Sequence, residues 1–320
     1  MPRGTVLVTG ASVRADLLEP LRAAGLEIDN PQTTLSEAEL TEKLSTASAY
    51  IKSGGETVTA ASLARADALK VIAFFGMGYE SSVDVEAARA KGIAITITHG
   101  VLNNAMADLT LGLILSAVRR IHLVATRYAQ GTPLAPEKRR DLAALTFGIL
   151  GMGGSGERIA EVLREGFRAP VNYFSRTRKP ELEARLGMGY RDFDALMAES
   201  DVLVVIVAGN KNTWGMIDAA AIARAKPGQV LINVARPAIV DPRALLAGLR
   251  DGPLSYAAFD GFYTEPADVL ADLKALMPEK LMVTSHIGSL THEARDAMGA
   301  KAVASALNML TRGEDADRVV

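Results

Sequence analysis

The sequence predicts an α/β fold with two doubly wound parallel-sheet domains and a cleft between them. Its 320 residues contain two separate series of short β-rich runs that alternate with helical stretches. A long helical stretch over residues 103–129 joins the two series. Alternation of this kind places helices on both faces of a parallel sheet, and the chain is long enough for two domains of ordinary size.

The first series predicts a flavodoxin-like domain whose opening turn holds no nucleotide. Its first β-rich run, "TVLVTG", ends at Gly10, and no further glycine follows before Gly25. The stretch also lacks the Tyr-x-x-x-Lys pair of a short-chain dehydrogenase, so we interpret Gly10 as the end of an ordinary strand. The other β-rich runs of this series are "AYIKSG" (49–54), "KVIAFFG" (70–76) and "IAITITHG" (93–100).

The second series begins with a glycine pattern that is typical of dinucleotide binding. Gly151, Gly153 and Gly156 form G-x-G-x-x-G directly after the strand "FGIL" and directly before the helix "ERIAEVLREGF". The first glycine allows a tight turn, the second admits the pyrophosphate, and the third lets helix and strand pack closely. The pyrophosphate then lies at the positive end of the helix dipole. We therefore predict a Rossmann domain here.

The residues after the next strand favour NADP over NAD. An acidic residue usually stands at the end of this strand and binds the adenosine ribose of NAD. Ser175 occupies that position here, and Arg176, Thr177, Arg178 and Lys179 follow it. A carboxylate would repel the 2′-phosphate of NADP, whereas a hydroxyl and a guanidinium would bind it. The alternative interpretation is a solvated basic turn.

Four chemically active side chains follow strands of the second series. Arg236 follows "LINVA", Asp260 and Glu265 follow "SYAAF", and His286 follows "KLMVTS". Open α/β sheets build their sites at the carboxyl ends of their strands. Arg236, Glu265 and His286 are therefore our candidates for the catalytic residues.

Composition excludes several other classes of function. The net charge of −2 predicts no general attraction to nucleic acid or to an anionic membrane. The absence of cysteine excludes disulfides, thiolate nucleophiles and zinc–thiolate sites, and the four histidines show no metal-ligand spacing, so we predict no metal. Apolar runs such as residues 202–209 are too short to span a membrane, and the N-terminus is not typical of a signal peptide. We expect a cytoplasmic protein.

Several ordered motifs together resemble one known family over essentially the whole chain. They are "FGMGYESSVDVEAARAKGIAI", "HGVLNNAMADLTLGLILSAVRR", the glycine turn, "NVAR", "TEP" and "HIGS". On these residues the sequence resembles the D-2-hydroxyacid dehydrogenase family. The turn "SRTRK" and the stretch "HIGSLTHEAR" are most similar to its NADP-dependent glyoxylate/hydroxypyruvate reductase branch.

The resemblance implies roles that agree with the chemistry of a 2-oxo acid. Arg236 would bind the carboxylate and polarise the ketone oxygen with its fixed fork of donors. His286 would donate a proton to the developing alkoxide as hydride arrives from the nicotinamide. Glu265, paired with His286, would favour the imidazolium. Asp260 matches the family residue that contacts the nicotinamide carboxamide.

The resemblance also implies two sets of binding residues. Substrate-binding residues would be Ser53, Gly54, Met77 and Gly78 from the first domain, together with Arg236 and His286. Cofactor-binding residues would be Met106, Gly151, Met152, Gly153, Gly154, Ser155, Gly156, Ser175, Arg176, Thr177, Arg178, Val207, Ala208, Thr213, Val234, Ala235, Asp260 and Gly288. Four positions depart from the family pattern, namely Pro237, Ser285, His99 and Val207.

These inferences lead to one preferred function and two alternatives. We expect residues 1–98 plus 289–320 to bind substrate, and residues 99–288 to bind NADP. The apolar helix at about 103–129 would lie between the subunits of a homodimer. The preferred function is NADP-dependent reduction of a small 2-oxo acid, of the glyoxylate or hydroxypyruvate type, to the D-2-hydroxy acid. The alternatives are a reductase for a bulkier 2-oxo acid and a cofactor-sensing, corepressor-like binding protein.

Overall fold

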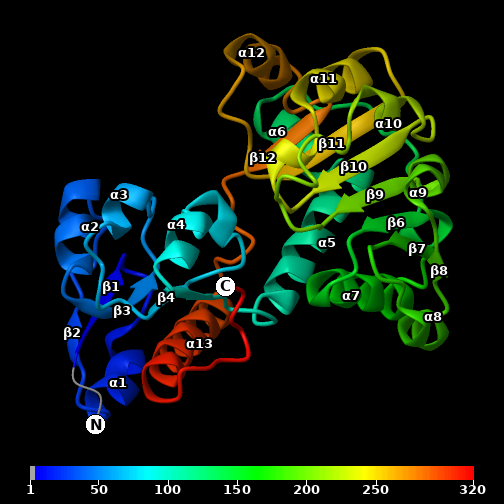
Figure 1. Cartoon of the computed structure of the whole chain (residues 1–320). Helices are drawn as coiled ribbons and strands as arrows, with labels where there is room; N and C mark the ends of the chain where they lie inside the picture. The colour runs from blue at the N-terminus through cyan, green and yellow to red at the C-terminus, as the bar shows by residue number, and fades with distance from the viewer. Residues whose placement is uncertain (1–3) are drawn as a thin grey trace. The chain divides into compact units, whose positions relative to one another are not determined.

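The computed structural model describes residues 4–320 and divides the chain into two compact units (Figure 1). Unit 1 comprises the chain up to Leu102 together with Leu290–Val320, and unit 2 comprises Asn103–Ser289. The first boundary lies later than residue 98, because Val101 and Leu102 pack against the core of unit 1. Lys301 also donates a hydrogen bond of 2.7 Å to the carbonyl of His99.

Unit 1 contains a five-stranded parallel sheet in the order β2-β1-β3-β4-β5, which is the flavodoxin-like order. Side chains alternate between its faces, as the period of two of a strand requires. On one face, Val6, Val8 and Ile51 pack with helices α1 and α13, and on the other, Leu7 and Tyr50 pack with α2, α3 and α4. The strands are β1 (Thr5–Thr9), β2 (Glu27–Asp29), β3 (Ala47–Lys52), β4 (Val71–Phe74) and β5 (Ala94–Thr96).

Helices α2, α3, α4 and α13 of unit 1 begin at residues whose side chains cap them. Ser36 and Glu39 form a capping box at α2, and Asp84 and Thr291 cap α4 and α13 through their side chains. The helices are α1 (Glu19–Ala23), α2 (Glu37–Leu44), α3 (Ala60–Leu63), α4 (Val85–Ala90) and α13 (His292–Thr311), with short 3-10 turns η1 (Ala15–Leu18) and η2 (Tyr79–Ser81).

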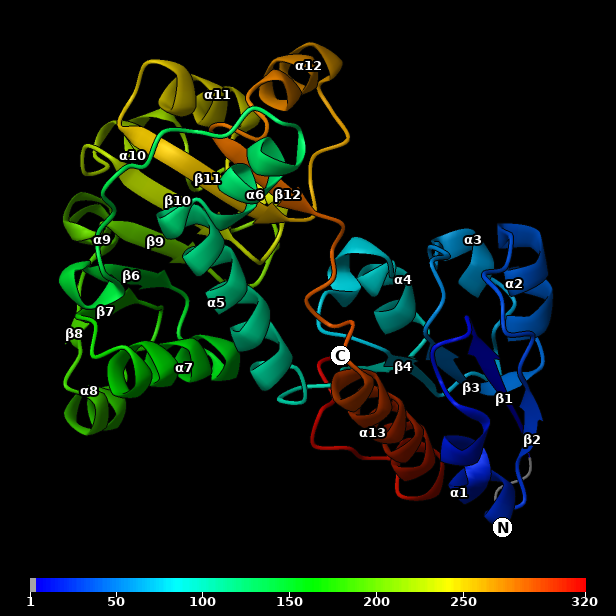
Figure 2. The same cartoon turned by 180° about the vertical axis from the view of Figure 1, so that it is seen from behind.

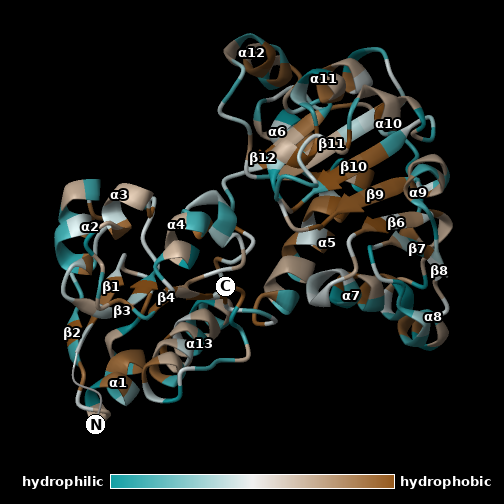
Figure 3. Cartoon of the chain, viewed as in Figure 1, coloured by the Kyte–Doolittle hydropathy of each residue, from teal (hydrophilic) through white to brown (hydrophobic). Residues whose placement is uncertain are grey.

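Unit 2 contains a seven-stranded parallel sheet in the order β12-β11-β10-β9-β6-β7-β8. Strands β7 and β8 are added on one side of β6, and β9 to β12 are added on its other side, so the strand order reverses between β6 and β9. Ligands of doubly wound folds bind at such a switch point. Figure 3 shows the apolar character of the strands. They are β6 (Phe147–Leu150), β7 (Val171–Phe174), β8 (Gly189–Tyr190), β9 (Val202–Val205), β10 (Gln229–Asn233), β11 (Leu254–Asp260) and β12 (Leu281–Thr284).

Helices cover both faces of the larger sheet. On one face of the sheet, a hydrophobic core includes α5, α7 and α8. On the other face, a second core includes α9, α10, α11 and α12. Figure 2 shows α5 and α7. The remaining helices are α7 (Gly154–Glu161), α8 (Pro180–Leu186), α9 (Phe193–Glu199), α10 (Ala219–Ala223), α11 (Pro242–Arg250) and α12 (Ala267–Ala275), with a π-helical turn η4 (Val162–Gly166) and 3-10 turns η3 (Leu142–Ala144) and η5 (Pro237–Ile239).

The expected single helix over 103–129 is wrong. The structure has α5 (Asn103–Arg119) and α6 (Ile121–Ala129), bent by 66° at Arg120, whose φ is +55°. Arg120 turns because its guanidinium donates to the carbonyls of Ser255 and Glu279 and stacks over the Tyr256 ring at 4.4 Å. Among the helices of residues 4–320, none is long and apolar enough by itself to cross a membrane, and α5 and α6 meet those criteria only as a bent pair.

Candidate active site

The glycine turn between β6 and α7 fits the backbone of a dinucleotide. Gly151 has φ +110°, and a Cβ atom there would lie 2.8 Å from the backbone of Ile206 and Val207. A Cβ atom at Gly156 would lie 2.3 Å from the carbonyl oxygen of Gly151. At Gly153 nothing lies within 4 Å of such an atom. Two glycines therefore allow close packing, and the middle one leaves open space in front of the helix N-terminus, where a pyrophosphate binds.

Helix α5 closes one side of this turn. Ser155 Oγ donates to Asn103 Oδ1 at 3.1 Å, and a Cβ atom at Gly154 would lie 2.5 Å from the Asn103 side chain. Met106, one turn further along α5, fills the space beside Gly288, where a Cβ atom would lie 2.7 Å from its sulfur. Asn103 was not among the predicted residues. Its place in the "NNAM" stretch before an apolar helix is the only sequence signal that could have indicated it.

The basic turn after β7 distinguishes its two arginines. Arg178 donates to both carboxylate oxygens of Glu183 at 2.9 and 2.8 Å, and the Tyr173 hydroxyl donates to the same carboxylate at 2.8 Å. These bonds lower the pKa of Glu183 to about 2, with the Arg178 bond contributing most. Ser175 Oγ donates to the carbonyl of Thr177 at 2.7 Å. Arg176 is exposed and makes no hydrogen bond or ion pair with any residue from 4 to 320. Of the two arginines, Arg176 is therefore the one whose guanidinium is uncommitted.

Arg236 follows β10 and is held by its own turn. Asn233 Nδ2 donates to the carbonyl of Arg236 at 3.0 Å, while Asn233 Oδ1 accepts from the amide of Ala235 at 3.0 Å. A Cβ atom at Gly209 would lie 2.5 Å from Arg236 Cγ, so Gly209 leaves the room that this side chain occupies. Gly209 was not predicted either. Burial lowers the pKa of Arg236, and the charge of Asp260 raises it.

Asp260 is the buried last residue of β11, and its carboxylate organises the loop that carries His286. It accepts hydrogen bonds from Thr284 Oγ1 at 2.7 Å, from the Ile287 amide at 2.8 Å and from the Gly288 amide at 2.9 Å. Three donors to one buried carboxylate fix the loop on both sides of the histidine. The predicted contact of Asp260 with a carboxamide stays a prediction.

His286 lies in an unusual backbone conformation at the exposed end of this loop. Its φ is +59°, a left-handed value that costs free energy for a residue with a side chain. The Asp260 bonds to the following two amides stabilise this conformation. Partial burial and then the positive charge of Arg236 lower the pKa of His286, whereas the charge of Asp260 raises it. Arg236, Asp260 and His286 thus influence one another electrostatically.

The expected pairing of Glu265 with His286 is not formed in this structure. No hydrogen bond or ion pair within the described chain joins them, and Glu265 is exposed. The reason lies in the same loop, where Phe262 and Tyr263 pack against Phe259 and hold the chain on the sheet. Without this pair, burial and then the Arg236 charge determine the direction, and the pKa of His286 is lowered rather than raised.

The other predicted cofactor residues follow strands at the same edge of the sheet. Thr213 Oγ1 donates to the carbonyl of Ala208 at 2.7 Å, which closes the loop after β9 on itself. The Val234 amide donates to the Val205 carbonyl at 3.2 Å. Met152 and Val234 lie in the core below the edge, while Val207 and Ala235 pack against the second core. In the part of the chain that the structure covers, no group of three or more His, Asp or Glu is arranged to hold a metal.

In unit 1, the predicted substrate residues lie in loops after the neighbouring strands β3 and β4. Ser53 and Gly54 follow β3, and Met77 and Gly78 follow β4. Between residues 4 and 320, none of their four backbone N–H groups donates to another group of the chain. Free amides that project from adjacent strand ends suit a carboxylate.

Gly10 packs against this loop, and this contact explains why a glycine stands there without a bound nucleotide. Its φ is +72°, and a Cβ atom there would lie 2.7 Å from the carbonyl oxygen of Ser53. Ser53 Oγ in turn donates to the carbonyl of Thr9 at 2.5 Å. The strand end after β1 is therefore packed against the loop after β3.

A dinucleotide turn at the switch point of a seven-stranded sheet, with arginine, aspartate and histidine after neighbouring strands, defines a nicotinamide-dependent oxidoreductase. A family model described as "D-isomer specific 2-hydroxyacid dehydrogenase, NAD binding domain" matches residues 111–288. The chain belongs to this family of dehydrogenases, and unit 2 carries its nicotinamide-cofactor domain.

Known relatives are similar along most of the chain. A glyoxylate reductase of Thermococcus litoralis is 36% identical over 285 residues, which are 86% of this chain and 84% of that protein. A glyoxylate/hydroxypyruvate reductase B of Yersinia enterocolitica is 34% identical and covers 95% of this chain and 94% of its own. The crystal structure of a glyoxylate reductase from Paecilomyes thermophila matches with a TM-score of 0.87 at 28% identity, over 100% of this chain and 99% of that one.

Proposed function

We propose that this protein reduces a small 2-oxo acid, glyoxylate or hydroxypyruvate, to the corresponding D-2-hydroxy acid with NADPH. The observation that carries the proposal is the combination of Arg236 and His286 after strands β10 and β12, close enough for the charge of one to lower the pKa of the other. The names of the similar reductases support the substrate class.

Each residue of the site has a distinct task in this reaction. Arg236 binds the substrate carboxylate and directs a donor toward the ketone oxygen, where negative charge develops. His286 gives its proton to that oxygen. The bound nicotinamide supplies the hydride. The amides of Ser53, Gly54, Met77 and Gly78 hold the carboxylate as neutral donors.

Arg176 is the residue that we propose reads the 2′-phosphate. Its guanidinium is free to form a charge-assisted bond, whereas Arg178 is already bound to Glu183 through two hydrogen bonds. Ser175 puts a hydroxyl where a carboxylate would repel the phosphate. The preference for NADPH over NADH thus depends mainly on one side chain.

We also propose that helix α6 packs against a second copy of the chain in a homodimer. Ile121, Val124 and Tyr128 are 54, 48 and 77% exposed on this helix. They line an apolar hollow of about 640 Å³ that also includes Leu115 and Ala125. In a dimer with two-fold symmetry, the same apolar patch of each subunit packs against that of the other and removes both from water. Light scattering at micromolar concentration should give about twice 33.8 kDa, and a stable monomer would contradict the assembly.

The deciding experiment is NADPH oxidation with a panel of 2-oxo acids. Glyoxylate and hydroxypyruvate should give the highest kcat/KM, and acids with branched or aromatic side chains should give lower values. Highest kcat/KM with a bulky acid would replace the proposed substrate by the larger class. NADPH binding without turnover of any acid in the panel would indicate a cofactor sensor.

A further inference from the structure

Two buried charged side chains lie directly beneath the loop after β3 and have no part in the reaction described so far. Lys52 is 4% exposed and Glu56 is 6% exposed. Burial of an ammonium or a carboxylate is costly unless hydrogen bonds compensate it. The bonds that these two side chains make therefore indicate what they do.

Lys52 holds the loop from below. Its Nζ atom donates to the carbonyl of Gly54 at 3.1 Å and lies 5.4 Å from the centre of the Phe74 ring. The amide at the other side of that same peptide group, Gly55 N–H, donates to Thr34 Oγ1 at 3.0 Å. The peptide between Gly54 and Gly55 is thus fixed at both its oxygen and its nitrogen.

Glu56 supports the same loop from inside the sheet. Its Oε1 atom accepts hydrogen bonds from the hydroxyls of Thr9 and Tyr50, both of which are fully buried. Its Oε2 atom is buried without a hydrogen-bond partner among the described residues. A Cβ atom at Gly54 would lie only 2.2 Å from Oε2, so the Gly54 backbone rests directly on the carboxylate.

We propose that Lys52 and Glu56 are positioning residues for the substrate carboxylate, because they fix the peptide after Gly54 so that the Ser53 and Gly54 amides stay free to bind it. This inference rests on the proposed function, which places the carboxylate at those amides. The positive charge of Lys52 lies one peptide group below the anion and adds to the attraction. Neither side chain touches the substrate.

The charge of Lys52 should make substrate binding sensitive to alkaline pH. Burial lowers the pKa of Lys52, and the charge of Glu56 partly opposes this. The other titratable group of the cluster, Tyr50, has its pKa raised by burial and by Glu56, so its hydroxyl keeps its proton. Thr9 on β1 and Phe74 on β4 do not titrate. Loss of the Lys52 proton should raise KM for the 2-oxo acid at high pH.

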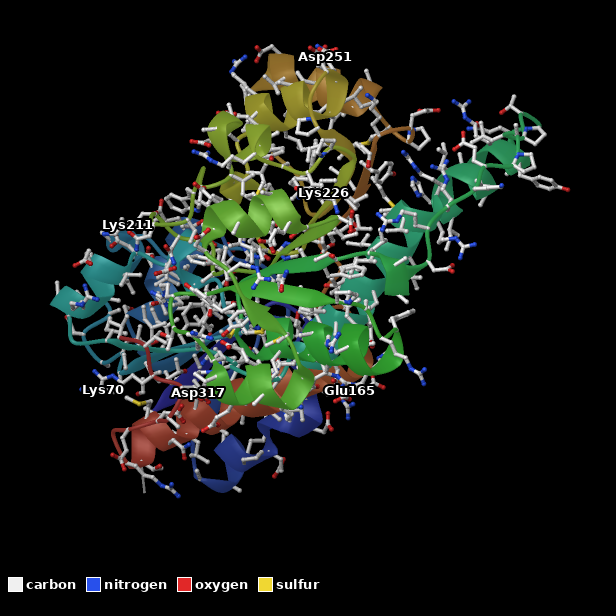
Figure 4. All side chains as sticks on the ribbon, turned by 90° about the vertical axis from the view of Figure 1, so that its right-hand side faces the viewer. Lys70, Glu165, Lys211, Lys226, Asp251 and Asp317 are labelled. Atoms are coloured by element: carbon white, nitrogen blue, oxygen red, sulfur yellow. The ribbon has the colours of Figure 1, made fainter. Side chains whose placement is uncertain are left out.

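The test compares Lys52→Met and Thr34→Val with the control Lys70→Met. Thr34 is exposed, so its variant should fold even if Lys52→Met does not. Lys70 is an exposed lysine at the amino end of the neighbouring strand β4, labelled in Figure 4. Hydrogen exchange of the Gly55 amide, KM and kcat with glyoxylate, and NADPH affinity are measured for all three variants and the wild type, with KM followed to alkaline pH.

Both test variants should exchange the Gly55 amide faster and raise KM for glyoxylate. The rise should be about tenfold for Lys52→Met, the size of one charge-assisted hydrogen bond, and smaller for Thr34→Val, whose bond to Gly55 joins neutral groups. Their NADPH affinity should match that of Lys70→Met, and Lys52→Met should lose the alkaline rise in KM. Unchanged exchange, or faster exchange with an unchanged KM, overturns the inference. A wild type that reduces no 2-oxo acid instead overturns the proposed function and the substrate role, and the exchange data then decide separately whether Lys52 holds the loop.

Discussion

The carboxyl edges of the two sheets present different chemistry. In unit 2, side chains with charge follow the strands: Arg176, Arg236 and His286. In unit 1, the loops after β3 and β4 present backbone amides, and the charges of Lys52 and Glu56 are buried below them. In the proposed reaction, unit 2 supplies the charged side chains that transfer a proton and bind the phosphate, whereas unit 1 supplies fixed, neutral donors to the substrate carboxylate.

Glycines at the two edges also differ in what occupies the space beside them. Gly153 in unit 2 has open space where a side chain would be, and its φ of −86° is accessible to any residue. Gly10 in unit 1 has φ +72° and faces the Ser53 carbonyl at close range. One glycine leaves room for a ligand, and the other leaves room for the protein itself.

The largest effect should come from the proton donor. Replacement His286→Asn should lower kcat by ~10²–10⁴-fold, the usual contribution of a general acid. Asparagine tolerates the left-handed backbone of this position, so the loop should keep its shape. Stopped-flow or steady-state reduction of glyoxylate measures the effect. The control is His292→Asn at the exposed start of α13, and an equal loss in both variants would show that His286 is not the acid.

The two glycine turns should respond to substitution in opposite ways. Replacement Gly153→Ala should weaken NADPH binding at least about tenfold and leave the free energy of unfolding within ~0.5 kcal/mol, because the added Cβ atom meets no atom of the described residues within 4 Å. Replacement Gly10→Ala should cost about 1–3 kcal/mol of stability through backbone strain and contact with Ser53. Cofactor fluorescence and urea unfolding separate the two outcomes. Weakened NADPH binding by Gly10→Ala alone would reverse our assignment of the turns.

The sequence indicated both sheets and the glycine turn because local signals determine them. Strand runs, turn residues and the three glycines all lie within short stretches, and helix and strand form around them. The break at Arg120 has no such signal. It depends on carbonyls 135 and 159 residues away in the chain, and a continuous apolar helix was therefore the reasonable but incorrect prediction.

The sequence predicted which residues follow the strands at the candidate site, but it predicted less well which of their side chains touch one another. Glu265 was expected beside His286, but the packing of Phe262 and Tyr263 on the sheet, which no local pattern reveals, leaves it in solvent. Gly209 was missed because its role appears only when Arg236 occupies the space beside it. Side-chain geometry of this kind depends on the whole sheet.

The next effect concerns the choice of cofactor. Replacement Arg176→Ala should reduce kcat/KM for NADPH by about 10–150-fold, the range of a hydrogen bond to a charged group, and leave NADH nearly unchanged. The matched control Arg178→Ala should lose less, since Glu183 already binds that guanidinium. Steady-state kinetics with both cofactors gives the ratio. Larger loss in the Arg178 variant would move the phosphate site to that residue.

The last effect concerns pH, and it separates the two edges without any mutation. His286 must carry its proton to act as the acid, and burial together with the Arg236 charge lowers its pKa below the ordinary 6.5. As pH rises through that lowered pKa, the protonated fraction falls, so kcat/KM for reduction should decline by up to about tenfold per pH unit. Substrate binding by the unit 1 amides should stay level across neutral pH, because amides do not titrate. We would measure kcat/KM from about pH 5 to 8, together with inhibition by oxalate, a carboxylate that cannot react. The first reports the His286 proton, and the second reports binding of the carboxylate. A kcat/KM that rises with pH would mean that the group titrating in this range acts as a base in the measured direction.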